Sequence, residues 1–237
     1  MTSAWTLLSW GSEGWLDDIA WGVFITVSLA LATLPLGIVA GFFIALAKRS
    51  EEPSLRLAGN IYTTIFRGLP ELLTLFLVYY GVQIGLQHLV RTISPDASIE
   101  VNSFVSGMVA LGVVLSAYAS EVFLSGFRAI PGGQYEGGFA VGLSSFQTMR
   151  LIIVPQLIRI TLPGLANLWL VLLLNTALVS AIGLSDILRQ VGIAARVTKE
   201  PLLFYGLGAL LYLCIAMVSS AGISAIERAA GQRGASR

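Results

Sequence analysis

Residues 19–47 read IAWGVFITVSLALATLPLGIVAGFFIALA, 29 consecutive positions without a charged side chain. A helix of about 20 apolar residues crosses the hydrocarbon core of a bilayer. Four further charge-free stretches follow, at residues 72–90, 101–120, 160–185 and 201–226, and the first of them extends back to residue 57 across mostly apolar positions. The pattern predicts five transmembrane helices, at approximately 19–47, 57–88, 101–120, 160–185 and 201–226.

The composition supports an all-α integral membrane protein with a single transmembrane domain over residues 1–237. Hydrophobic residues make up 56% of the chain and charged residues 11%, against about 25% charged in an average soluble domain. This apolar content excludes disorder, and a net charge of +1 gives no footprint for nucleic acid. With only Cys214 and His88 available, a disulfide or a Cys/His zinc site cannot form, so we expect neither metal nor cofactor.

The distribution of cations predicts the orientation. With the N-terminus outside, nine cations fall on inner segments: Lys48, Arg49, Arg56, Arg128, Arg150, Arg159, Arg228, Arg233 and Arg237. Four fall on outer loops: Arg91, Arg189, Arg196 and Lys199. Because cytoplasmic loops carry the excess of Lys and Arg, we expect the N-terminus outside and the C-terminus in the cytoplasm.

The longest connection, inner loop 121–159, is patterned as helices rather than as a linker. Glu121–Ile130 is followed by a Pro-Gly-Gly breaker, and Gln134–Val141 forms a second short helix with Gly142 as its C′ residue. A short helix held out between two turns is suited to docking into a groove of another protein.

A third helix follows in the same loop. Ser144 and Gln147 have the spacing of a capping box, and the helix that they open is expected to reach Val154, just before Pro155.

Within this loop, Glu136-Gly137-Gly138, three residues, Gly142, nine residues and Ile152-Ile153-Val154-Pro155 follow one another. This arrangement resembles the EAA loop of ABC importer permeases. Segments 129–136, 147–150, 66–72 and 175–180 resemble the polar amino-acid branch, especially permeases for histidine, lysine, arginine and ornithine and for the opines octopine and nopaline.

The resemblance implies a type I ABC importer fold in the bacterial inner membrane. It implies two permease subunits around the pathway (a homologue, giving a heterodimer, or a second copy of this chain), ABC ATPase subunits below and a periplasmic solute-binding protein. The ATPase-coupling residues would be Glu136, Gly137, Gly138, Gly142, Ile152 and Pro155. The chain departs from the pattern in two places: Gly137 and Gly138 replace two alanines, and Asn175 stands where many relatives carry lysine.

An ATP-driven pump needs a nucleotide site, and this sequence has none that is recognisable. Its two lysines, Lys48 and Lys199, do not follow a glycine, so the P-loop pattern G-x-x-x-x-G-K-[ST] is absent. We therefore expect a transport subunit without enzymatic activity, with ATP hydrolysed by a separate chain. The alternatives are an ATP-independent channel or secondary carrier for small polar solutes, and a membrane anchor that recruits a soluble partner.

Polar residues inside the spans are candidates for the pathway or its gate. Arg67 and Glu71, four residues apart on one helix face, are predicted to form an ion pair, either as a structural brace beside Pro70 or as a gate.

Three further candidates, Asn167, Asn175 and Thr176, lie in the fourth span. They form hydrogen bonds to neighbouring helices in one interpretation and line a solute path in the other. In the first span, Gly37 and Gly41 have the spacing of a close contact with another helix.

Overall fold

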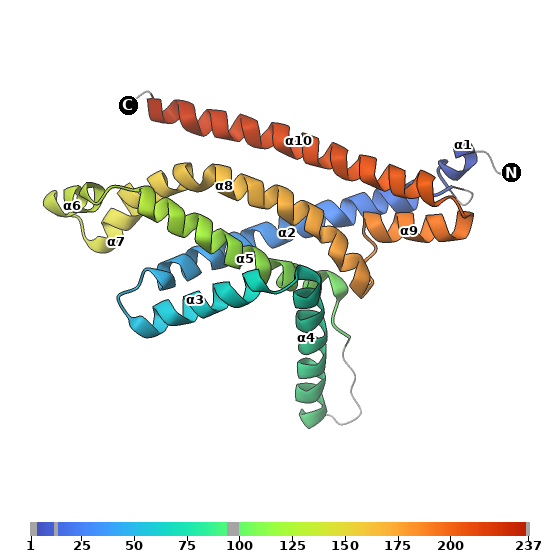
Figure 1. Ribbon diagram of the computed structural model, residues 1–237, viewed down its shortest axis with the longest axis horizontal. Helices are drawn as coiled ribbons and strands as arrows, with labels where there is room; N and C mark the ends of the chain where they lie inside the picture. Colours follow the sequence, from blue (N-terminus) through green and yellow to red (C-terminus); the bar gives the residue numbers. More distant parts are fainter. Residues whose placement is uncertain (1–3, 12–13, 94–99, 236–237) are drawn as a thin grey trace.

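The computed structural model describes residues 4–11, 14–93 and 100–235, which form helices without a strand (Figure 1). The long helices are α2 (Leu16–Lys48), α4 (Glu71–Ile93), α5 (Ser103–Ala129), α8 (Val154–Asn175) and α10 (Pro201–Ala235). The shorter ones are α1 (Ala4–Leu7), α3 (Pro53–Gly68), α6 (Gly133–Ala140), α7 (Ser145–Thr148), α9 (Ile187–Thr198), the π-helix η1 (Met149–Ile153) and the 3-10 helix η2 (Thr176–Ile182).

Five helical segments are long and apolar enough to cross a membrane, which agrees with the prediction. They are Leu16–Lys48, Glu71–Thr92, Ser103–Ala129, Ser145–Ile182 and Pro201–Arg228. The end of α10 lies at the same end of the bundle as α6, and the start of α2 lies at the opposite end (Figure 1). An odd number of spans requires this arrangement.

α5 is the central helix, in contact with α2, α3, α4 and α8 and buried along most of its length. The predicted small-residue contact is found here, between α2 and α5. A Cβ atom added at Gly41 would lie 2.7 Å from the Cβ of Ala119, and one added at Gly37 would overlap Leu115. Glycine at both positions lets the two backbones approach closely, as is usual between transmembrane helices.

The expectation of one continuous second span over residues 57–88 is wrong. α3 ends at Gly68, Leu69 has extended backbone angles (φ −86°, ψ 144°), and α4 then leaves the bundle at a steep angle (Figure 1). The cause is Pro70, which has no N–H and disfavours helical angles at the residue before it.

The fourth span also differs, because the helix begins well before residue 160 and does not stop at Pro155. α7, η1 and α8 follow one another without a gap. In η1 the N–H of Val154 donates to the carbonyl of Met149, five residues back. A widened π-turn before Pro155 accommodates a residue that has no N–H to give to the helix.

Candidate functional site

The coupling loop presents α6 between two turns that are built from local hydrogen bonds. Gly142, at φ +84°, ends α6 as its C′ residue, as predicted. The N–H of Leu143 donates to the carbonyl of Gly138 and that of Gly142 to Phe139, both at 3.0 Å, which are the two bonds of a Schellman motif. The left-handed angle at Gly142 explains why glycine is needed there.

The second turn is the capping box that the sequence predicts. The N–H of Ser144 donates to Oε1 of Gln147 at 2.9 Å, and the N–H of Gln147 donates to Oγ of Ser144 at 3.3 Å. These reciprocal bonds fix the start of α7 and with it the return of the chain into the bundle.

The outer side of α6 is apolar and has no cover in the described part of the chain. Phe139 is 50% exposed and Val141 is 75% exposed, and Glu136 lies one turn before Phe139 on the same short helix. We call Glu136, Gly137, Phe139 and Val141 the coupling surface. An exposed apolar patch beside a charge is typical of a protein contact. The sequence analysis missed Phe139 and Val141, although their place next to the EAA-like residues could have indicated them.

The two glycines of the motif have different surroundings. A Cβ added at Gly137 would meet nothing within 4 Å, so this residue is open on the coupling surface. A Cβ added at Gly138 would lie 2.6 Å from Cγ2 of Thr148 and 3.2 Å from Cδ1 of Ile152. Gly138 therefore lets α6 pack directly against α7 and η1, with Ile152 beneath it. Pro155 is exposed where α8 begins.

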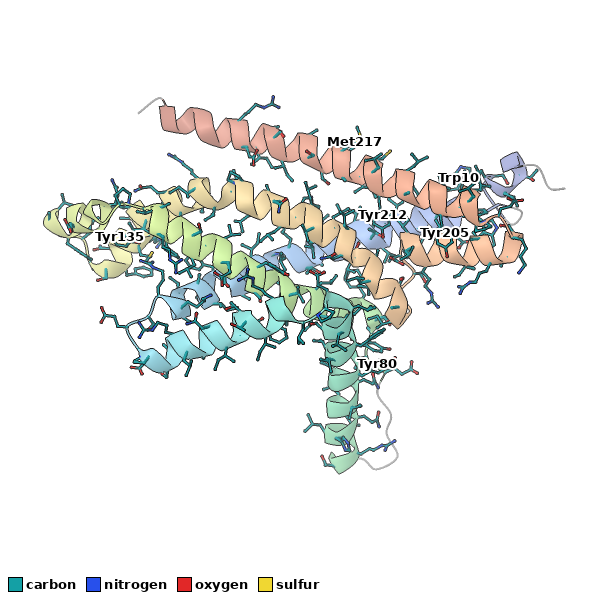
Figure 2. All side chains as sticks on the ribbon, viewed as in Figure 1. Trp10, Tyr80, Tyr135, Tyr205, Tyr212 and Met217 are labelled. Carbon is teal, nitrogen blue, oxygen red and sulfur yellow. The ribbon has the colours of Figure 1, made fainter. Side chains whose placement is uncertain are left out.

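Side chains at the base of α6 connect it to the membrane helices. Nη2 of Arg49, just after α2, donates to the hydroxyl of Tyr135 at 3.1 Å, and its guanidinium lies 4.1 Å from the centre of the Phe127 ring on α5. Nε2 of Gln156 on α8 donates to Oε1 of Gln134 at 2.9 Å. Side chains of α6 are thus connected to Arg49 at the end of α2, through Arg49 to Phe127 of α5, and to Gln156 of α8. The Tyr135 label in Figure 2 marks this region.

The predicted ion pair between Arg67 and Glu71 is wrong. The two residues lie on either side of the break at Pro70, so they no longer share a helix face. Nη1 of Arg67 lies 3.2 Å from Oε1 of Glu121 on α5, and Nζ of Lys48 donates to the same oxygen at 2.5 Å. Lys48 also donates to Oγ1 of Thr63 at 3.1 Å. This charged cluster joins α2, α3 and α5, and the lysine side chain is only 6% exposed.

Glu71 instead lines a cavity together with Asn175, another of the predicted residues. The cavity has a volume of about 20 Å³ and lies between α4, α5 and α8, and Tyr118 and apolar side chains also line it. The ring of Tyr118 also lies 5.6 Å from the guanidinium of Arg67, so Tyr118 links Arg67 to the cavity. No motif or spacing in the sequence indicates Tyr118 as part of this group.

The remaining candidates are separated. Asn167 lies on the exposed face of α8, one turn before the exposed Val171. Thr176 is fully buried and its hydroxyl donates to the carbonyl of Leu173 at 2.7 Å. Asn175 is the last residue of α8, where the α-helix tightens into the 3-10 helix η2. Only Glu71 and Asn175 are therefore brought together.

Thr176 belongs to a buried polar cluster at the end of the bundle away from α6. Asp186 is fully buried before α9, with Oδ1 accepting from the N–H of Arg189 at 2.9 Å. The hydroxyl of Tyr212 faces Asp186, Thr176 and Thr26. Within the described residues, neither Oδ2 of Asp186 nor this hydroxyl has a partner at hydrogen-bonding geometry. Burial raises the pKa of Asp186 to about 6, against the lowering effect of the backbone N–H groups and Arg189.

Comparisons with known proteins cover most of the chain. Residues 34–232 match the family described as binding-protein-dependent transport system inner membrane component. The chain is 39% identical over 228 residues to the nopaline transport system permease protein of Agrobacterium fabrum, covering 94% of this chain and 95% of that protein. It is 36% identical over 215 residues to the histidine/lysine/arginine/ornithine transport system permease protein of Salmonella typhimurium, with coverage of 91% and 94%.

Two solved structures are similar. The crystal structure of an amino acid ABC transporter with histidines superposes with a TM-score of 0.76 at 31% identity, covering 90% of this chain and 94% of that one. An inward-facing MetNI methionine ABC transporter superposes with a TM-score of 0.71 at 18% identity, covering 91% and 97%, which supports the fold alone.

Proposed function

Because the chain belongs to the family of binding-protein-dependent transport system inner membrane components, we propose that it forms the pathway of an ATP-driven importer for a polar amino acid or an opine. It is a multi-pass permease of the bacterial inner membrane. Relatives that are named for nopaline and for histidine, lysine, arginine and ornithine support basic amino acids or opines as the substrate class.

The single observation that carries the coupling role is the uncovered apolar side of α6. Phe139 and Val141 are exposed at the end of a helix of eight residues whose base bonds to Arg49 and Gln156. In this proposal a groove of a separate ATPase subunit covers the coupling surface. Closure of the ATPase then moves α6, and the contacts at its base carry the movement into α2, α5 and α8.

A second permease subunit, a homologue or another copy of this chain, completes the pathway in this proposal. α4 projects from the bundle and exposes Leu73, Leu77 and Ile84 (Figure 1). On the same side of α5, Arg67 and Tyr118 lead towards the cavity lined by Glu71 and Asn175. Polar groups at membrane depth usually face a cavity or a partner. The exposed Asn167 would face the pathway between the two subunits.

Reconstitution tests the proposal against its rivals. The chain is placed in liposomes alone, and then together with the neighbouring permease, the ATPase and the solute-binding protein of its operon. Uptake of radiolabelled arginine, histidine and nopaline is followed with and without ATP. We expect uptake only with all the components and ATP. Uptake by the chain alone would identify a channel or carrier, and ATPase recruitment without any uptake would identify an anchor.

A further inference from the structure

A hollow at the end of the bundle away from α6 carries two arginines that form no ion pair within the described part of the chain, although the charge of Arg189 also acts on the buried Asp186. It has a volume of about 290 Å³ and lies between η2, α9 and α10. Arg189 and Arg196 approach it from α9, two turns apart, and Tyr205 approaches it from α10 (Figure 2 labels Tyr205). This group takes no part in the coupling or the pathway described above.

The hydroxyl of Tyr205 approaches α9 at Gly192, at a point along the helix between Arg189 and Arg196. It is 3.5 Å from the position that a Cβ atom would take on Gly192, which is three residues after Arg189 and four before Arg196. Glycine at position 192 therefore leaves room at the floor of the hollow. Nη1 of Arg189 donates only a long bond, 3.5 Å, to the carbonyl of Ser180, so most of its donors are available. Two guanidinium groups and a hydroxyl form a donor set that suits a phosphate.

Contacts between α9 and α2 indicate at which level of the membrane the hollow lies. A Cβ atom on Gly22 would lie 3.0 Å from the backbone of Asp186 and Ile187, so the start of α9 is level with Trp21 and Gly22. Trp21 is 55% exposed and stacks on Phe24, with ring centres 5.2 Å apart. Exposed tryptophan marks the membrane–water interface.

The length of α2 agrees with this depth. Its 33 residues extend about 50 Å, more than the hydrocarbon core of about 30 Å, so α2 is long enough for both of its ends to lie in the headgroup layers. From Ile187 onward α9 runs beside α2, and its Val191 and Ala195 belong to the same buried cluster as Ile19. Arg189 and Arg196 are therefore at the level of the lipid phosphates.

We infer that the hollow formed by Arg189, Arg196 and Tyr205 binds the phosphate of an anionic phospholipid in the adjoining leaflet. The apolar Leu188 and Val197, both exposed beside the arginines, would contact the glycerol and upper acyl region. An acidic surface of a solute-binding protein is a different partner. It is less favoured because the hollow lies at the level of the exposed Trp21, within the interfacial layer.

Native mass spectrometry of the full-length chain, purified with its co-purifying subunits, tests the inference. The protein is titrated with phosphatidylglycerol and with zwitterionic phosphatidylcholine. We expect preferential retention of phosphatidylglycerol. Arg189→Gln together with Arg196→Gln should weaken that retention by about tenfold or more, because two charge-assisted bonds are lost. Lys199→Asn is the matched control, since it removes a cation just after α9, suits the left-handed backbone there (φ 62°) and should change retention little.

Two further arms separate the sources of the phosphate. Inorganic phosphate at millimolar concentration should not displace the lipid, and displacement would show a site for the free anion. Equal retention in the wild type and the double variant would overturn the inference. So would a double variant that retains lipid normally but no longer binds the solute-binding protein. Unchanged size-exclusion profiles verify that the double variant folds.

Discussion

The two ends of the bundle differ in the exposure of their side chains, which are apolar and exposed at one end and polar and buried at the other. At the α6 end, Phe139 and Val141 are exposed, and short local bonds hold the helix above the spans. At the other end, Asp186 and Thr176 are fully buried among α2, η2, α9 and α10. The α6 end leaves apolar surface that another protein can cover. The buried polar residues at the other end join helices of this chain to one another. In the proposed function the ATPase acts at α6, and the buried polar cluster would keep its place.

The largest effect is expected on the coupling surface itself. Phe139→Asp places a charge where the ATPase would bury an aromatic ring, and an unpaired buried carboxylate is costly. Uptake and ATPase co-purification should both fall by more than about tenfold, since burial of a phenylalanine alone contributes about 1.5–3 kcal/mol. Phe139→Leu, which keeps an apolar side chain, should retain most of the uptake. If Phe139→Asp transports normally, α6 is not the docking element.

The charged cluster of Lys48, Arg67 and Glu121, on the α6 side of the bundle, is the next test. Glu121→Gln leaves the buried Lys48 without its carboxylate and should lower the free energy of unfolding by on the order of 3 kcal/mol. Arg67→Gln is the matched variant. Because the Arg67 side chain is 43% exposed, its loss should cost less than about 1 kcal/mol. Thermal unfolding of both variants in detergent measures the difference, and equal losses would contradict this account of the cluster.

The buried polar cluster should make the free energy of unfolding depend on pH, which the α6 end should not. The pKa of Asp186 rises from 3.8 to about 6 on folding, so the folded chain holds this proton more tightly than the unfolded chain. The free energy of unfolding should therefore decrease as the pH rises from about 4 to about 6 and level off above that. The raised pKa corresponds to an effect on the order of 2–3 kcal/mol.

Asp186→Asn isolates this contribution. The asparagine still accepts from the N–H of Arg189 but cannot ionise beside Tyr212 and Arg189. Thermal unfolding of wild type and variant between pH 4.5 and 7.5 should differ in slope, with the variant more stable at neutral pH. Parallel curves would show that Asp186 is charged in the folded chain.

The smallest effects separate the two glycines of the motif. Gly137→Ala meets no neighbour and should stabilise α6 by about 1 kcal/mol, with uptake unchanged. Gly138→Ala would press on Thr148 and Ile152 and should destabilise the loop by about 1–3 kcal/mol and lower uptake. Circular dichroism, thermal unfolding and uptake of the full chain compare the two variants. Equal behaviour would mean that α6 can move away from η1.

The sequence predicts those structural features that depend on residues close to one another in the chain. Gly142 ends α6 and Ser144 bonds to Gln147 because these interactions span only a few residues. The presence of five apolar spans is likewise predicted from length and hydropathy, although the second and fourth spans begin at other residues than expected. Within the loop, the sequence predicts the two turns that flank α6, but not the continuation of the helix through Pro155.

Contacts between distant segments could not be predicted in the same way. Arg67 bonds to Glu121, more than fifty residues away, because Pro70 removes Glu71 from its helix face. Tyr118 and Arg49 carry no local signal that connects them to Arg67 or Tyr135. The helix that was expected to end at Val154 instead continues through the π-helix η1 into α8, since a widened turn before Pro155 accommodates the proline.

Hydrogen exchange of α6 tests the central claim most directly. Amide exchange across residues 133–142 is measured in the membrane-embedded chain, alone and with its ATPase subunit, before and after ATP is added. The account predicts slow exchange only when the ATPase is present, with a further change on nucleotide binding, while the segment around Asp186 stays constant. Exchange in residues 133–142 that is the same with and without the ATPase would contradict it.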